Sequence, residues 1–200
     1  TERARGHPNT AFAVASMGEP LSFSDTMVTS TPDLNPIKAF VFCGQGPQHE
    51  HMGVHMYTRF AAFRNSVNAS FEMVAKFHKK NFQDEYGLFN PELNGKVAKT
   101  DKGDWKVECI VIAITIFQIA LFDLWVDLGV QPDVVLGHSV GEIAAMYASG
   151  ALTHEKAIRT AIARSNALSL LDTIDGQMAA LGMSRREAEQ LIQRIMKENG

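Results

Sequence analysis

The chain has 200 residues and a formal net charge of −3, and 46% of its residues are hydrophobic while 20% are charged. This composition is typical of a globular chain that holds one domain, or one domain and part of another. The net negative charge argues against nucleic acid as a partner, because phosphate binding requires a concentrated basic surface.

The N-terminal part predicts a connector that leads into a buried strand. Residues 10–16 favour a short strand, and residues 17–36 combine Gly, Pro, Ser and Asp in the manner of a surface connector. Residues 39–42 form a compact apolar run, Ala-Phe-Val-Phe, which two glycines stop within the next four residues. Such a run predicts a buried strand.

Helices dominate the middle of the sequence. Apolar residues recur at helical spacing over residues 57–79, which indicates one amphipathic helix or two. Residues 81–106 mix Asn, Asp, Gly, Pro and Lys and are expected to be irregular. A long apolar helix is predicted over residues 107–128, and a second buried strand over residues 134–136.

Further helices and a weaker strand are predicted in the C-terminal third. Residues 141–149 and 154–171 favour helices, the second with Thr153 as its N-cap. Residues 177–183 alternate weakly and favour a strand. Residues 184–187 form a capping box that opens a last helix, whose inward residues are expected to be Ala188, Leu191, Ile192 and Ile195. Apolar strands that alternate with helices predict an α/β fold with a parallel sheet.

Cysteine content and apolar runs favour a cytoplasmic chain without a membrane partner. The two cysteines, Cys43 and Cys109, form no disulfide framework and suit a reducing compartment. Residues 1–16 carry charge and only a brief apolar run, unlike a signal peptide. The longest apolar run extends from Cys109 to Leu121, which is too short to span a bilayer and favours a buried helix.

The pattern Gly-x-Ser-x-Gly occupies residues 137–141, directly after a predicted strand and directly before a predicted helix. This is the setting of a nucleophile elbow, in which glycines permit a sharp turn and the serine lies near a helix N-terminus. Backbone N–H groups there can stabilise an oxyanion, so we predict that Ser139 is a nucleophile. The alternative is that Ser139 only caps the helix. Its neighbour His138 is expected to be a packed histidine rather than a general base.

A second glycine-rich turn contains Gly44, Gln45 and Gly46 and follows the first predicted strand. His49 stands where a dinucleotide-binding G-x-G-x-x-G would need glycine, and the chain lacks the Gly-Lys-Ser/Thr of a P-loop. Because α/β sheets hold ligands at the carboxyl ends of their strands, the N–H groups of this turn could face the carbonyl that Ser139 attacks. An ordinary tight exit from a strand is equally compatible with the pattern.

Arg164 shares a helical stripe with Ala157, Ala161 and Leu168 and is therefore predicted to face the core. A buried guanidinium needs a carboxylate, which either the protein or a substrate could supply. Arg159 lies off this stripe and is expected to be solvated. The histidines of residues 49–55 depart from H-E-x-x-H and lack a third ligand pattern, so no metal site is expected.

Four segments together carry a family resemblance: FVFCGQGPQHEHMG, GVQPDVVLGHSVGEIAAMYASGALT, Arg164-Ser165 and GQMAALGM. In order and spacing they resemble the acyltransferase domain of polyketide and fatty acid synthases, and the stand-alone malonyl-CoA:acyl-carrier-protein transacylases. The resemblance covers residues 38–190. Residues 1–16 also resemble the end of the linker that joins ketosynthase to acyltransferase, which implies a neighbouring ketosynthase domain in a megasynthase.

The resemblance implies a role for each matched residue. Ser139 would accept the acyl group, the backbone N–H groups of Gln45 and Val140 would form the oxyanion hole, and Arg164 would bind the free carboxylate of a malonyl-type unit. That unit would pass from coenzyme A, through the acyl-enzyme, to the phosphopantetheine thiol of an acyl carrier protein, and no permanently bound cofactor is implied. Val140 stands where methylmalonyl-selective members tend to carry Gln, which favours malonyl. Further pocket residues would be His138, Gly44 and Gly46.

The resemblance also implies an organisation and two departures from the family. Residues 1–36 would be linker and connector, residues 37–175 an α/β-hydrolase-like large subdomain, and residues 176–200 the start of a ferredoxin-like small subdomain. Val111 and Ile112 stand where many members have Gln and Pro.

The second departure concerns the general base. The family's catalytic histidine lies further along than the 61 residues that follow Ser139, and His154, the only later histidine, is in the wrong place for it. We therefore expect this chain to lack a general base and to turn over little by itself. Two other functions remain open: a serine esterase or thioesterase with the same elbow, and a non-catalytic docking or structural fragment.

Overall fold

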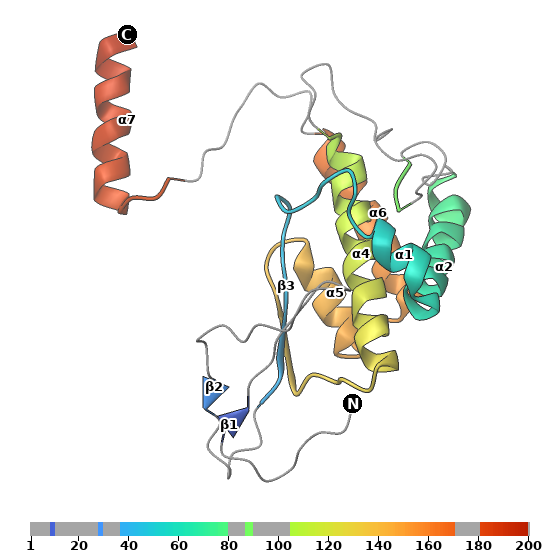
Figure 1. The fold of residues 1–200 in the computed structure, drawn as a ribbon. Coiled ribbons are helices and arrows are strands. Elements are labelled where there is room, and N and C mark those ends of the chain that lie inside the picture. Colours follow the sequence, from blue (N-terminus) through green and yellow to red (C-terminus); the bar gives the residue numbers. More distant parts are fainter. Residues whose placement is uncertain are drawn as a thin grey trace.

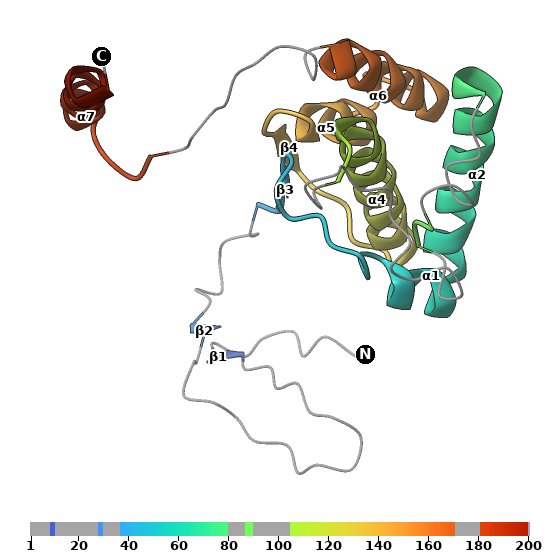
Figure 2. The same cartoon turned by 90° about the horizontal axis from the view of Figure 1, so that it is seen from above.

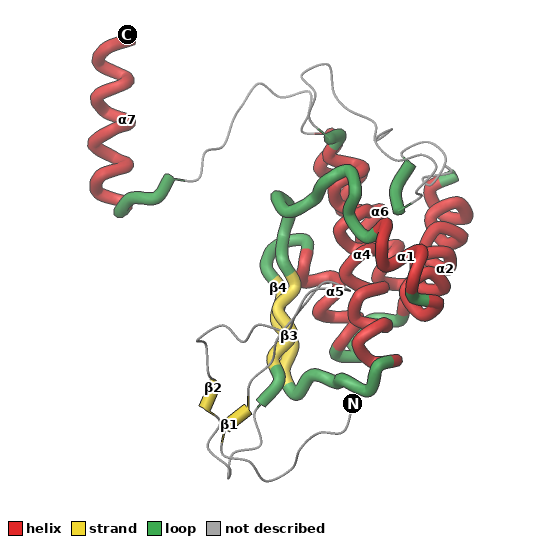
Figure 3. Tube along the Cα trace, viewed as in Figure 1, coloured by secondary structure: helices red, strands yellow, loops and turns green. Residues whose placement is uncertain are grey.

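The computed structural model describes residues 9–10, 28–29, 37–79, 87–89, 105–170 and 181–199. Within these ranges most residues are helical, and a small parallel sheet accompanies the helices (Figures 1 and 3). This arrangement confirms the predicted α/β class with a parallel sheet.

The parallel sheet consists of β3 (Ala39–Phe42) and β4 (Val134–Gly137). The strands pair in register from Ala39 opposite Val134 to Phe42 opposite Gly137. Parallel neighbours require a crossover connection, and the intervening chain supplies it with helices. Because both strands run in the same direction, the turn after β3 and the turn after β4 emerge at the same end of the sheet.

Five helices form a helical layer on one side of the sheet: α1 (Val54–Arg59), α2 (Ala61–His78), α4 (Val107–Asp127), α5 (Gly141–Ala148) and α6 (His154–Ser169). The predicted helical stretch 57–79 is confirmed as two helices, because Phe60 between them has extended dihedrals of φ −114° and ψ 116°. Thr153 caps α6 as predicted, since its hydroxyl accepts a hydrogen bond of 3.3 Å from the Lys156 backbone N–H.

Helix α4 is the centre of the core. Figure 2 shows it surrounded by α2, α5 and α6, and eleven of its residues are buried. The predicted buried helix is confirmed, but it extends beyond the Cys109–Leu121 run: with 21 residues it is long and apolar enough to cross a membrane by length and composition, so it is not too short for a span. Because α4 is buried against the other helices, it is the core helix of the described fold.

The two faces of the sheet differ in what covers them. Phe40 and Phe42 face α4, where their rings lie 6.3 Å and 6.5 Å from the ring of Phe122. On the opposite face Val41 is 67% exposed and Leu136 is 48% exposed. The prediction that both strands are buried is therefore wrong for this face, which no described element covers.

The N-terminal residues that are described form only a short hairpin-like pair. β1 (Asn9–Thr10) pairs antiparallel with β2 (Val28–Thr29). The predicted strand over residues 10–16 lies outside the described residues beyond Thr10, and the predicted connector contains β2. Of the predicted irregular stretch 81–106, only residues 87–89 and 105–106 are described.

The last described helix is α7 (Arg185–Asn199), which Figure 1 shows apart from the other helices. The predicted capping box is confirmed: the Glu187 carboxylate accepts from the Ser184 backbone N–H at 2.8 Å, and the Ser184 hydroxyl accepts from the Glu187 N–H at 3.4 Å. The inward direction predicted for its apolar residues is wrong for Ile192 and Ile195, which are 53% and 47% exposed. Residues 181–183 form a bend rather than the predicted strand, whose other residues lie outside the described part.

Candidate active site

The turn of residues 137–141, called the elbow below, holds Ser139 in a left-handed backbone conformation with φ 54°. A non-glycine residue in this region is strained, and such strain is concentrated at functional sites. β4 leads into the turn and α5 leads out of it, so the strand–turn–helix setting predicted for the elbow is confirmed. The turn is closed by hydrogen bonds from Gly141 N–H to His138 O at 2.9 Å and from Glu142 N–H to Ser139 O at 3.2 Å.

The glycines of the elbow are required by close contacts between backbones. A Cβ on Gly137 would lie 2.5 Å from the backbone of Gly141 and Glu142. A Cβ on Gly141 would lie 2.5 Å from the carbonyl carbon of Phe42, in β3. Real Cβ atoms do not approach this closely, which explains the Gly-x-Ser-x-Gly spacing in steric terms.

The Ser139 hydroxyl does not serve as a helix cap. Helix α5 has Val140 at its N-cap position and no side-chain cap hydrogen bond. Instead, the Ser139 Oγ accepts a hydrogen bond of 3.1 Å from Nη2 of Arg164 in α6. The cap-only alternative is therefore excluded for this hydroxyl.

Arg164 occupies the core-facing position that its helical spacing predicted. Ala157 and Ala161 on the same stripe are buried, and Arg164 itself is half-buried. Its Nε is buried and donates no hydrogen bond to any described residue. No carboxylate in the described part of the chain lies within ion-pair distance of the guanidinium. The structure thus places a positive charge with unused donor capacity beside Ser139.

The loop of residues 43–46, called the β3 loop below, packs directly against the elbow. A Cβ on Gly44 would lie 3.0 Å from Nδ1 of His138 and 3.2 Å from Cβ of Ser139. Within the described residues, neither the Gln45 N–H nor the Val140 N–H donates a hydrogen bond. These two groups are therefore free to receive a ligand oxygen. The Gly46 N–H, by contrast, is taken up by Oε1 of Gln48 at 2.6 Å.

No described histidine is hydrogen-bonded to Ser139. His154 lies in the first turn of α6, where its Nε2 is 2.7 Å from the Ser70 hydroxyl and its ring packs on Tyr147. Ten residues separate it from Arg164, which is roughly 15 Å along a helix. His138 is exposed. Among the described residues there is also no group of three His, Cys, Asp or Glu side chains arranged to hold a metal ion.

Sequence reasoning missed one polar residue near this site. Gln118 was counted within the apolar run of α4, yet it is 6% exposed and its amide hydrogen-bonds to the carbonyl of Cys43 in the β3 loop. A lone amide in an apolar helix was the available signal, because a buried amide needs a hydrogen-bond partner.

Comparisons with known proteins place this geometry in a family. The family model for the acyl transferase domain matches residues 39–198. The chain is 36% identical over 169 residues to a highly reducing polyketide synthase of Strobilurus tenacellus, a match that covers 84% of this chain and 6% of that protein. It is also 36% identical over 181 residues to a highly reducing polyketide synthase of Aspergillus terreus, over 88% of this chain and 7% of that protein. The chain thus spans less than a tenth of these relatives.

Solved structures give the same result for the fold. The loading acyltransferase of the avermectin modular polyketide synthase superposes with a TM-score of 0.54 at 33% identity, over 66% of this chain and 39% of that one. The acyl transferase domain of ZmaA superposes with a TM-score of 0.63 at 21% identity, over 86% of this chain and 38% of that one. Both have the α/β fold described above.

Proposed function

The chain belongs to the acyl transferase domain family found in polyketide synthases, and on this premise we propose that it moves a malonyl-type group from coenzyme A, through Ser139, to the phosphopantetheine thiol of an acyl carrier protein. The curated relatives are polyketide synthases, and one structural neighbour is described as a malonyl-CoA:acyl-carrier-protein transacylase of Synechocystis sp. PCC 6803, at 24% identity and a TM-score of 0.54. Coenzyme A and the carrier thiol enter as substrates, and no permanently bound cofactor is proposed.

The observation that carries the proposal is the pairing of Ser139 with an arginine that has no carboxylate partner among the described residues. The Arg164 Nη2 lies 3.1 Å from the Ser139 Oγ, and its buried Nε has no partner among the described residues. A half-buried guanidinium in this state favours an anionic ligand, and a planar fork of donors matches a carboxylate. A malonyl group carries its free carboxylate beside the thioester that a nucleophile attacks, so it suits this site better than an uncharged acyl group.

The proposed chemistry has two transfers that use the same groups. The Ser139 Oγ attacks the thioester carbonyl while its proton passes to a base, and the carbonyl oxygen becomes an oxyanion near the N–H groups of Gln45 and Val140. Collapse of the tetrahedral intermediate breaks the carbon–sulfur bond and releases the coenzyme A thiol. The phosphopantetheine thiol then attacks the Ser139 ester, and the serine regains its proton.

We propose that the base for this reaction is none of the described histidines, since no hydrogen bond joins a described histidine to the Ser139 hydroxyl. His154 is committed to Ser70, and His138 makes no hydrogen bond to the Ser139 hydroxyl. We therefore propose that the 200-residue chain alone is acylated slowly, and that efficient transfer requires a base outside the described residues.

We further propose that the chain works inside a cytoplasmic multidomain synthase, beside a ketosynthase domain. Its small share of each curated relative's length supports this placement. The family match over residues 39–198 also supports a boundary after the predicted connector of residues 1–36.

The test is malonyl loading of Ser139 in the full-length polypeptide that carries this sequence. Incubation with malonyl-CoA followed by peptide mass spectrometry should show one malonyl group on the peptide that contains Ser139. Ser139→Ala should abolish the adduct, because no other nucleophile is held at the elbow. Arg164→Ala should slow loading by about 100-fold while leaving acetyl-CoA loading unchanged or faster, since only malonyl presents a carboxylate.

A matched control is Arg159→Ala on the same helix. Arg159 is 61% exposed and its ion pair with Glu155 is 3.8 Å long, so its loss should leave loading within a factor of two. Absence of any adduct on the wild-type polypeptide would overturn the acyltransferase proposal. Hydrolysis of uncharged esters that survives Arg164→Ala would instead support an esterase.

A further inference from the structure

Gln118 is a buried amide inside the most apolar helix of the chain. It lies in the middle of α4, where it is 6% exposed and its neighbours include the buried core residues Ile114 and Ile119. Burying an amide without hydrogen-bond partners is unfavourable, because the amide loses its hydrogen bonds to water. A residue of this kind in a core helix therefore needs an explanation in its contacts.

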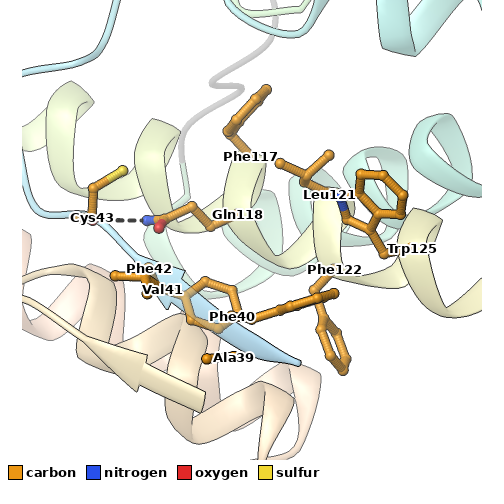
Figure 4. Close-up of a pocket in the computed structure, with 10 residues that line it drawn as sticks. All are labelled: Ala39, Phe40, Val41, Phe42, Cys43, Phe117, Gln118, Leu121, Phe122 and Trp125. Carbon is orange, nitrogen blue, oxygen red and sulfur yellow. Dashed lines mark hydrogen bonds between the residues drawn. The ribbon is translucent and has the colours of Figure 1, made fainter. Parts of the chain in front are cut away.

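The contacts of Gln118 reach out of the helix to the β3 loop. Its Nε2 donates to the Cys43 carbonyl at 3.1 Å, as Figure 4 shows, and more weakly to the Ile114 carbonyl within α4 at 3.4 Å. Cys43 is 75 residues away in sequence, so this hydrogen bond ties the core helix to the loop. Among the described residues, Gln118 is the one side chain from another element that hydrogen-bonds to the β3 loop.

The Cys43 carbonyl lies where it can influence the neighbouring oxyanion donors. It sits 2.7 Å from the position that a Cβ on Gly141 would occupy, so it is enclosed between Gln118 and the elbow. The next residue, Gly44, abuts His138 and Ser139. Because a peptide unit is planar, fixing the Cys43 carbonyl also fixes the Gly44 N–H. The contacts of Gly44 with the elbow limit its two backbone dihedrals, so the direction of the next N–H group, that of Gln45, is restricted in turn.

We propose that Gln118 is a positioning residue for acyl transfer: its hydrogen bond to the Cys43 carbonyl aims the Gln45 N–H at the oxyanion that forms on Ser139 attack. The inference rests on the proposed function, since it assigns a task to the same site. It predicts an effect on the chemical step rather than on binding, because the donor is needed most when the charge develops.

The first test is single-turnover malonylation of Ser139 at several malonyl-CoA concentrations in the full-length polypeptide. Gln118→Leu keeps the volume close but removes the donor, and its maximal acylation rate should fall about 10- to 100-fold. The half-saturating concentration should stay within about twofold of the wild-type value. An unchanged maximal rate would overturn the proposal.

The matched control is Thr115→Val, one turn earlier on α4. Thr115 is fully buried, and its hydroxyl donates to the Val111 carbonyl at 2.8 Å, so the substitution removes a buried side-chain hydrogen bond that stays inside the helix. Its acylation rate should remain within about twofold of wild type. A loss equal to that of Gln118→Leu would show that α4 stability, not the link to the β3 loop, is what matters.

A second variant gives a readout that a purely structural role would not produce. In Gln118→Glu the introduced carboxyl can donate to the Cys43 carbonyl only while it is protonated, and burial favours that neutral form. The acylation rate relative to wild type should therefore rise as the pH is lowered. If the ratio of the variant's acylation rate to the wild-type rate does not change with pH, the loss of rate is not caused by loss of the hydrogen bond to the Cys43 carbonyl.

A fluorophosphonate probe separates this inference from the proposed function. It reacts with an activated serine and uses the same oxyanion donors, but it needs no carboxylate clamp. If the probe labels the wild-type protein but malonyl-CoA does not, the malonyl proposal is refuted. The role of Gln118 is then still tested, because Gln118→Leu should react with the probe more slowly than wild type. Wild type labelled by neither would refute both, and equal labelling of Gln118→Leu and Thr115→Val would refute the positioning role alone.

Discussion

At the scale of single residues, Gly141 differs from most of the described glycines because backbone atoms occupy the place of its missing side chain. A Cβ there would collide with the carbonyl groups of Phe42 and Cys43. Gly141→Ala should destabilise the fold by about 3 kcal/mol or more, because β3 and the elbow would have to separate. Urea unfolding followed by the fluorescence of Trp105 and Trp125 measures this loss.

The control for that substitution is Gly150→Ala. Gly150 has φ +78° but no atom within 4 Å of its Cβ position, so only the backbone strain of about 1 kcal/mol applies. Similar losses in the two variants would show that a small shift of β3 relieves the contact, contrary to the steric explanation of the motif.

The sequence predicts those features of the site that depend on neighbouring residues, such as the helix face on which a side chain lies. The face of Arg164 followed from helical spacing alone, since the period of an α-helix fixes which residues share a stripe. Its hydrogen bond to Ser139 did not follow, because only the packing of α6 against the elbow brings them together. Gln118 escaped prediction for the same reason: its partner is 75 residues away in sequence.

At the scale of elements, four helices meet in a partly buried polar cluster. His154 of α6 contacts the Ser70 hydroxyl of α2, while Tyr147 of α5 donates to Asp123 of α4 at 2.8 Å and Ser66 of α2 donates to the same carboxylate at 2.5 Å. Burial raises the pKa of Tyr147, and the bonded Asp123 raises it further, so this hydroxyl stays protonated. The Asp123 carboxylate therefore joins three of the helices, because it accepts hydrogen bonds from the hydroxyls of Ser66 and Tyr147.

This cluster predicts a loss of stability in mild acid. Burial lowers the pKa of His154 from its ordinary value of 6.5, although Asp123 opposes the shift. As the pH falls through 6.5, the unfolded chain takes up a proton that the folded chain resists, so the free energy of unfolding decreases until the folded-state pKa is passed. Above that window the contribution is constant.

The measurement is urea unfolding of wild type and His154→Gln at pH values between about 7 and 5. Wild type should lose more stability over this range than the variant, which has no imidazole at this position. His55→Gln, at an exposed position of α1, should behave as wild type. If the free energy of unfolding depends on pH identically in wild type and His154→Gln, His154 is not the cause of the loss of stability in acid.

Helices were better predicted than the surroundings of the strands, for a physical reason. The α4 and α5 bounds agree with the sequence prediction to within one residue, because an apolar period and nearby glycines mark a helix locally. A strand's apolar run marks the strand, but whether each face is covered depends on distant segments. That is why Phe42 is buried while Val41, the preceding residue of the same strand, is 67% exposed.

At the scale of the whole molecule, the helices cover one face of the sheet and leave the other apolar face open (Figures 1 and 2). The open face carries Val41, Val134 and Leu136, which are 67%, 47% and 48% exposed and neighbour one another through the strand register. A contiguous apolar patch next to short strands whose outer edges pair with no other described strand is an association surface.

We predict that the 200-residue chain self-associates through this face. The double substitution Val41→Thr and Leu136→Thr keeps strand-compatible side chains but makes the face polar, so it should shift the sedimentation profile towards monomer and reduce binding of a hydrophobic dye. Leu128→Thr, an equally exposed apolar residue at the end of α4, should change neither, because a single scattered side chain forms no patch. Association that persists unchanged in the double variant would show that another surface, such as the exposed apolar residues of α7, is responsible.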